Sequence, residues 1–114
     1  EMIKIYHNPR CRKSREGLTI LENSGKEFEI IYYLNAIPSE KKLTKIIHLL
    51  GIPPIQLVRK NEKIWKENFK GKEISDAQII KAMVENPKLI ERPIVINNGK
   101  AVIGRPPENI IAIL

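Results

Sequence analysis

Residues 2–34 carry the pattern that most constrains the fold, because an amphipathic stretch lies between two apolar runs. Residues 2–6 (MIKIY) end just before a proline loop, which predicts a buried strand. Residues 14–23 place leucines on one face and stop before Gly25, which predicts a helix. The aromatic and β-branched run 28–34 predicts a second strand. Strand, helix and strand at this spacing indicate a βαβ unit with parallel strands and a right-handed crossover.

The middle of the chain is predicted to be helical. Ser39 and Gly51 bracket an amphipathic stretch as helix cap and helix stop. Residues 55–68 look helical but irregular, and Ser75 with Gln78 forms a capping-box pattern before a further helix. We therefore expect a helical segment between the βαβ unit and the C-terminal part.

The C-terminal part carries the strongest local signal. Asn98-Gly99 lies between two apolar runs, which predicts a β-hairpin over residues 94–103 with a type I′ turn. A short helix is predicted over residues 108–114. The order is β-α-β, helical segment, β-hairpin, α. We predict a single thioredoxin-like α/β domain over residues 1–114, built on a four-stranded mixed sheet.

The amino-acid composition limits the cellular compartment, the kinds of site and the class of ligand that we expect. The chain has 42% hydrophobic and 29% charged residues, a net charge of +7, two histidines and one cysteine. One cysteine excludes an internal disulfide, and these few ligands predict no metal site and no bound cofactor. No apolar run approaches the roughly 18 residues of a membrane span, so we expect a cytoplasmic protein without membrane contact. No nucleic-acid motif accompanies the positive charge, which favours an anionic substrate over nucleic acid.

The single cysteine, Cys11, is predicted to lie at the start of the first helix. Unpaired backbone N–H groups and the helix dipole favour a thiolate there. Cations crowd the same position, namely Arg10, Arg12, Lys13 and Arg15. This setting favours a reactive cysteine over a buried structural one.

The spacing around Cys11 limits its chemistry. The motif is C-x-x-S, with Ser14 where a dithiol oxidoreductase carries its second sulfur. A hydroxyl caps a helix or bonds a thiolate, but it resolves no mixed disulfide, so the second thiol must come from glutathione or a partner protein. Gly17 stands where a C-x5-R phosphatase loop requires arginine, which excludes that class.

Other polar residues are candidates for the same site. Arg92 and Arg105 flank the predicted hairpin, so both are expected at the same end of the sheet. Together with Arg59 they are interpreted as a clamp for an oxyanion, because planar guanidinium groups bind oxyanions in bidentate fashion. The Arg92-Pro93 bond is a candidate cis peptide. His7 is expected to order the loop before Cys11 by hydrogen bonding, in preference to shuttling a proton.

Four co-linear segments resemble the glutaredoxin-linked arsenate reductase family. Residues 7–15 (HNPRCRKSR) are similar to its active-site loop H-N-P-x-C-x-x-S-R. Residues 57–61 (LVRKN), 86–95 (NPKLIERPIV) and 104–108 (GRPPE) are similar to its later motifs. The resemblance covers essentially the whole chain and is greatest to a shorter branch with N-P-R-C and I-G-R-P-P-E.

The resemblance implies a thioredoxin-like fold and reduction of arsenate or a similar oxyanion. In the family's mechanism, glutathione attacks a cysteine–arsenate adduct, arsenite leaves, and glutaredoxin reduces the resulting mixed disulfide. Carried over by motif, Cys11 is the nucleophile and the oxyanion is held by Arg59, Arg92 and Arg105. The residues expected to tune the thiolate are His7, Ser14 and Arg15.

Two alternatives stay open at this point. Arg10 stands where the best-known reductases carry a small residue, which allows a glutathione-dependent thiol oxidoreductase of another substrate on the same scaffold. A non-enzymatic redox regulator that binds RNA polymerase shares this fold, although Ser14 breaks the C-x-x-C switch common to such regulators. Binding of nucleic acid ranks last.

Overall fold

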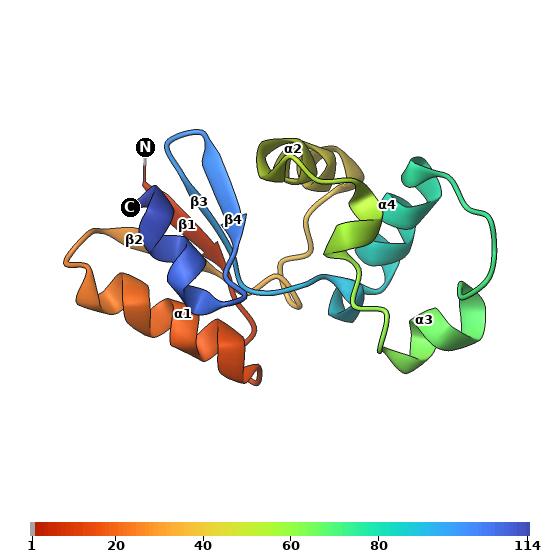
Figure 1. The fold of residues 1–114 in the computed structure, drawn as a ribbon, viewed down its shortest axis with the longest axis horizontal. Helices are drawn as coiled ribbons and strands as arrows, with labels where there is room; N and C mark the ends of the chain where they lie inside the picture. The colour runs from red at the N-terminus through yellow and green to blue at the C-terminus, as the bar shows by residue number, and fades with distance from the viewer. Residues whose placement is uncertain (1) are drawn as a thin grey trace. The chain divides into compact units, whose positions relative to one another are not determined.

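The computed structural model describes residues 2–114, whose contacts separate into two compact units. One unit runs to Ala36 and resumes at Arg92–Leu114, and it contains the sheet. The other unit, Ile37–Glu91, is helical (Figure 1). A single domain over residues 1–114 stays a prediction. No helix within residues 2–114 is both long and apolar enough to cross a membrane.

The sheet unit confirms the predicted four-stranded mixed α/β architecture. Its strands are β1 (Ile3–Tyr6), β2 (Phe28–Ile31), β3 (Ile94–Asn97) and β4 (Lys100–Ile103), in the order β2-β1-β3-β4. β1 is parallel to β2 and antiparallel to β3, and β3 pairs antiparallel with β4. The β3–β4 turn has positive φ at Asn98 (54°) and Gly99 (79°), as the predicted type I′ turn requires.

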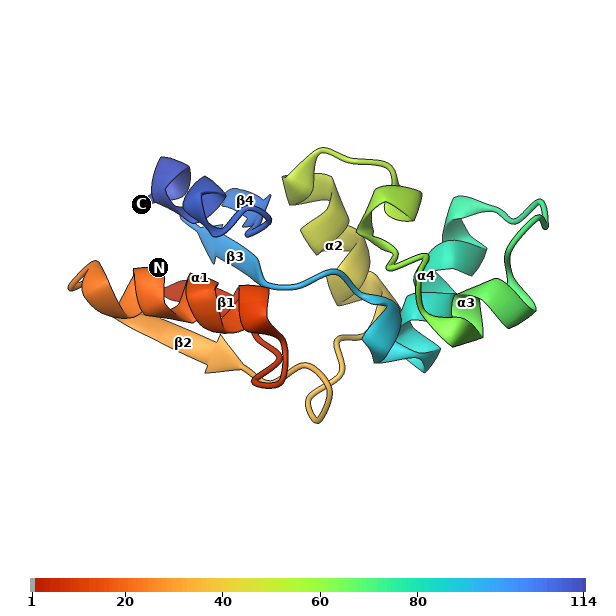
Figure 2. The same cartoon turned by 60° about the horizontal axis from the view of Figure 1, so that its bottom comes forward.

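Two helical elements cover one face of this sheet (Figures 1 and 2). They are α1 (Arg12–Asn23) and the 3₁₀ segment η3 (Pro107–Ile113), which pack against each other. The apolar core beneath them consists of buried Ile3, Ile5, Leu21, Val95 and Ile110. Alternation along β1 places Ile3 and Ile5 on the same face, which explains why this face is the covered one.

Gly17 lets α1 approach its neighbours closely. A Cβ atom at this position would lie 2.8 Å from Pro93 Cγ and 2.9 Å from Ile110 Cδ1. Gly104 is equally confined, because its Cβ would lie 2.8 Å from Pro93 Cγ. The absence of a side chain at these two glycines therefore allows α1, the start of the hairpin and η3 to pack closely around Pro93.

The helical unit contains α2 (Glu40–Leu50), η1 (Pro54–Leu57), α3 (Lys63–Asn68), α4 (Asp76–Glu85) and η2 (Pro87–Leu89). The predicted caps are confirmed: Ser39 Oγ accepts from Lys42 N–H, and Gly51 ends α2 in the left-handed region. Ser75 and Gln78 form the predicted capping box of α4. α2 packs on α4, which also contacts η1 and η2.

Three predicted elements differ in detail. β2 stops at Ile31, because the next residues form a turn in which Ala36 N–H donates to Tyr32 O. The irregular stretch 55–68 is interrupted at Val58, which makes an extended bridge to Ile90. The last helix is 3₁₀ in type and begins at Pro107.

Candidate active site

The loop after β1 presents Cys11 at the start of α1. His7 N–H donates to Ile31 O at 2.9 Å, which extends the pairing of β1 with β2 by one step. Cys11 N–H donates to Asn8 O at 3.0 Å, and Cys11 is the N-cap residue of α1 in an extended conformation. No acidic residue lies in the first turn of α1. The partial positive charge of the helix N-terminus therefore acts on the cysteine without a carboxylate in that turn to offset it.

A buried hydrogen-bond network holds this loop. Ser14 Oγ accepts from Asn8 N–H at 3.0 Å and lies 2.6 Å from His7 Nδ1. Asn8 Oδ1 in turn accepts from Arg10 N–H at 3.0 Å. His7, Asn8 and Ser14 are all buried. His7 therefore orders the loop through Ser14, and the Ser14 hydroxyl bonds to this network.

The surroundings of His7 favour its neutral form. Burial is the largest effect and lowers the pKa of His7. The hydrogen bond with Ser14 raises this pKa in part, and the charges of Arg15 and Glu22 then lower and raise it, respectively, by less. The ring edge of Tyr32 packs on the imidazole, with ring centroids 5.9 Å apart. A neutral imidazole has one donor and one acceptor nitrogen, which suits the contact with a hydroxyl.

The sulfur of Cys11 is partly exposed and lies among positive charge. Burial by itself raises the pKa of the thiol. Interactions with the backbone N–H of Ser14, with the guanidinium of Arg92 and with the backbone N–H of Lys13 outweigh it, so the pKa lies below the ordinary value of a thiol. The thiolate is therefore favoured at lower pH than in an ordinary cysteine.

Arg92 and Arg105 come from the far end of the chain to this sulfur. Arg105 Nη1 lies 3.9 Å from Cys11 Sγ and donates to Arg92 O at 3.2 Å. Arg92 is 8% exposed, and hydrogen bonding and charge from its guanidinium lower the pKa of Cys11. The bonds Arg92–Pro93 and Arg105–Pro106 are both cis, the first as predicted.

Two further predicted residues, Arg59 and Arg15, are each held by partners in their own unit. Arg59 belongs to the helical unit, where Nε is 3.4 Å from a Glu62 carboxylate oxygen and Nη1 is 3.4 Å from one of Glu91. Arg15 Nη1 donates to Pro9 O at 3.0 Å, so this guanidinium braces the loop. The catalytic and tuning roles assigned to all these residues stay predictions.

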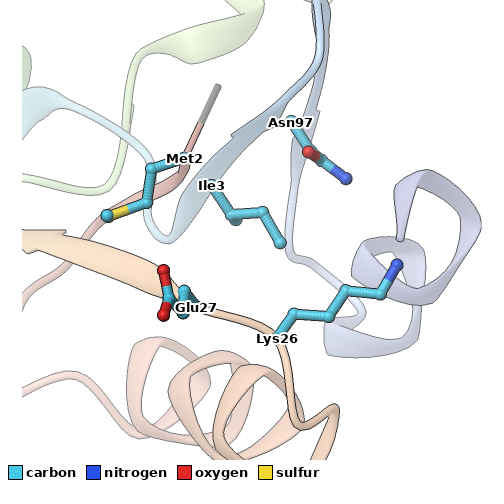
Figure 3. Close-up of a pocket in the computed structure, with 5 residues that line it drawn as sticks. All are labelled: Met2, Ile3, Lys26, Glu27 and Asn97. Carbon is cyan, nitrogen blue, oxygen red and sulfur yellow. The ribbon is translucent and has the colours of Figure 1, made fainter.

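A separate hollow of about 450 Å³ opens at the other end of β1 and is lined by Met2, Ile3, Lys26, Glu27 and Asn97 (Figure 3). The Lys26 and Asn97 side chains extend toward the C-terminal segment (Figure 3), where they donate to the carbonyl oxygens of Leu114 and Ile113. This hollow includes none of the predicted site residues. Within residues 2–114, no three metal-ligating side chains come together.

Sequence reasoning missed two contributors to the site. Asn8 organises the loop through its carbonyl, its N–H and its side chain, and an asparagine before proline is a known turn signal that points to it. Glu16 pairs with Arg12 at 3.3 Å and with Lys13 at 3.4 Å. The i, i+4 and i, i+3 spacing of these charges could have revealed both pairs.

The chain is similar to known proteins over nearly its whole length. A sequence model of the ArsC family matches residues 6–113. The arsenate reductase of Haemophilus influenzae is 46% identical, over 96% of this chain and 97% of that protein. The arsenate reductase of Neisseria meningitidis is 40% identical, over 98% and 97%. The solved structure of the arsenate reductase from Vibrio cholerae superimposes with a TM-score of 0.94 at 45% identity, over 99% of this chain and 98% of that one.

Proposed function

The chain belongs to the ArsC family, and from this premise we propose that it reduces arsenate. In this proposal Cys11 is the nucleophile, and glutathione and glutaredoxin supply the electrons. The chain brings one thiol to the reaction, so the reducing equivalents must come from outside the chain. A reducing compartment suits such a cycle, and we place the protein in the cytoplasm.

One observation carries the proposal: Arg105 Nη1 is 3.9 Å from Cys11 Sγ, and the guanidinium of Arg92 lowers the pKa of the same thiol. These guanidinium groups lower the energy of the thiolate and offer donors to an oxyanion at the same point. A nucleophile and the donors for its target thus meet within one site, as attack on arsenate requires.

The proposed chemistry balances in three steps. The Cys11 thiolate attacks arsenic and forms an S–As(V) bond, while one As–O bond breaks and its oxygen leaves as water with protons from the arsenate hydroxyl and from solvent. The thiolate of glutathione then attacks Cys11 Sγ, the S–As bond breaks, and its electron pair reduces arsenic to As(III), which leaves as arsenite. The two sulfurs are now a mixed disulfide. Glutaredoxin takes the glutathionyl group and returns Cys11 as a thiol.

Arg59 is proposed as the third oxyanion ligand because residues 57–60 (LVRK) match the family's motif. Its guanidinium is already paired with Glu62 and Glu91, at 3.4 Å each. An incoming oxyanion would compete with these carboxylates for the same donors. We therefore assign Arg59 a smaller contribution to oxyanion binding than Arg92 and Arg105.

The test is arsenate-dependent oxidation of NADPH through glutathione reductase and glutaredoxin, with Cys11→Ser as the inactive control. The wild-type protein should turn over, and omission of either glutathione or glutaredoxin should stop the cycle. Mass spectrometry should find glutathione on Cys11 after incubation with arsenate and glutathione. Absence of turnover with a demonstrably reduced Cys11 would contradict the proposal.

A second candidate, removal of glutathione from mixed disulfides, is favoured by the exposed Arg10 next to Cys11. Arg10 adds an exposed cation one residue before Cys11, in addition to the arginines that are proposed to bind the oxyanion. This activity would consume a glutathionylated substrate without arsenate. Turnover of such a disulfide that arsenate neither stimulates nor inhibits would favour this candidate.

A further inference from the structure

The cations around Cys11 differ in how their charge is compensated. Arg12 Nε and Lys13 Nζ both pair with Glu16, at 3.3 Å and 3.4 Å. Arg15 Nη1 donates to Pro9 O at 3.0 Å. Each of these three side chains therefore has an internal partner that holds it on α1 or on the loop.

Arg10 is the exception among these four. Its backbone is fixed, since its N–H donates to Asn8 Oδ1 at 3.0 Å and the next residue donates its N–H to Asn8 O. Its side chain is exposed, and in the part of the chain that the structure describes its guanidinium meets neither an acceptor nor a carboxylate. A turn with a hydrogen-bonded backbone thus carries an exposed, uncompensated guanidinium one residue before the nucleophile.

We propose that Arg10 binds a carboxylate of the thiol that attacks Cys11, and so selects anionic thiols such as glutathione over neutral ones. The inference rests on the proposed function in one respect, that an external thiol reacts at Cys11. Guanidinium and carboxylate match as bidentate partners. Arg92 and Arg105 face the sulfur itself, so the second reactant needs a cation of its own beside that group.

The reaction that Arg10 assists is thiol–disulfide exchange at Cys11, and it is measurable without arsenate. Cys11 is first converted to a mixed disulfide with 2-thiopyridine, a neutral leaving group. The thiolate of the added thiol attacks Cys11 Sγ, the S–S bond to 2-thiopyridine breaks, and pyridine-2-thione is released with the proton of the thiol. One disulfide is exchanged for another, so no further oxidant or reductant is needed.

The experiment compares release rates with glutathione and with glutathione diethyl ester, which lacks both carboxylates. Arg10→Gln should slow glutathione by about twofold to fivefold, the range for an exposed ion pair, and should not slow the diester, whose only charge is its ammonium group. Arg10→Lys should restore part of the loss, and 1 M salt should shrink the difference between the two thiols. Each thiol is compared with itself between variants, so differences in intrinsic reactivity cancel.

Arg12→Gln is the matched control, because it removes the same charge two positions away from a side chain already paired with Glu16. It should affect the two thiols alike. Equal slowing of both thiols by Arg10→Gln, or no slowing of either, would overturn the inference. Discrimination at Cys11 in a protein that fails to reduce arsenate would overturn the proposed function alone.

Discussion

The two units of the molecule hold their arginines in different ways. In the sheet unit, Arg105 donates to a backbone carbonyl, that of Arg92, and lies 3.9 Å from the sulfur. In the helical unit, Arg59 lies between the carboxylates of Glu62 and Glu91. A neutral carbonyl orients a guanidinium without cancelling its charge, whereas a carboxylate compensates that charge. The two carboxylates therefore reduce the positive charge that Arg59 can offer to an anion.

The largest expected effect on activity comes from removing an arginine of the sheet unit. Arg92→Ala should lower kcat/KM for arsenate by about 10²–10³, the cost of removing one preorganised oxyanion donor. Arg59→Ala should lower it by only about fivefold, because the carboxylates already share that charge. Steady-state kinetics of the coupled reaction measures both. Equal losses would show that ion pairing does not distinguish the two arginines.

A second prediction concerns the packing that supports the sheet unit. Gly17→Ala should lower the free energy of unfolding by about 1–3 kcal/mol, because the new Cβ would lie within 3 Å of Pro93 and Ile110. An alanine in a helix otherwise stabilises relative to glycine, so the sign is diagnostic. Denaturant titration measures it, with Glu22→Ala on the exposed side of α1 as the control. A stabilised Gly17→Ala would contradict the close packing.

A third prediction follows from the pKa of Cys11. Because this pKa is lowered in the folded protein, thiolate forms on raising the pH earlier than in an ordinary cysteine. The pH profile of iodoacetamide alkylation should therefore rise at lower pH than that of free cysteine. Arg92→Ala removes a hydrogen bond and a positive charge from the sulfur, so its profile should move to higher pH. An unmoved profile would separate Arg92 from the thiolate.

The smallest effect should come from removing one carboxylate partner of Arg59 in the helical unit. Glu91→Gln removes one of the two carboxylates on Arg59 and should lower KM for arsenate by about twofold to threefold, the range of a part-exposed ion pair. Glu85→Gln removes the same charge from an exposed position of the same unit and serves as the control. A fall in KM in both variants would indicate a general charge effect.

Local signals predicted much of the fold. The cap residues Ser39, Gly51 and Ser75 act through hydrogen bonds to neighbours three or four residues away, so they are visible in a short window of sequence. The hairpin is equally local, since Asn98 and Gly99 tolerate positive φ. The early end of β2 was missed, because Tyr32 favours strands by propensity but here turns back and packs on His7.

The site was less predictable, because its distances join segments far apart in the chain. The approach of Arg105 to Cys11 spans 94 positions and depends on the pairing of β1 with β3. The Glu62 partner of Arg59 is three residues away and visible in a local window, but the Glu91 partner is 32 positions away and is not. Helix-start chemistry did predict the environment of Cys11, because backbone N–H groups at a helix start are a local property.

Ser14 limits how a protein of this kind could acquire a second, resolving cysteine. Its hydroxyl is fully buried and joins Asn8 to His7, so it is part of the framework that carries the nucleophile. A Ser14→Cys mutation would supply a second thiol, but it would also remove the hydroxyl that joins Asn8 to His7 in the loop before Cys11. A single substitution at this position therefore does not give the chain an internal reductant without disturbing the loop of the nucleophile. Proteins with this serine depend on thiols from outside the chain.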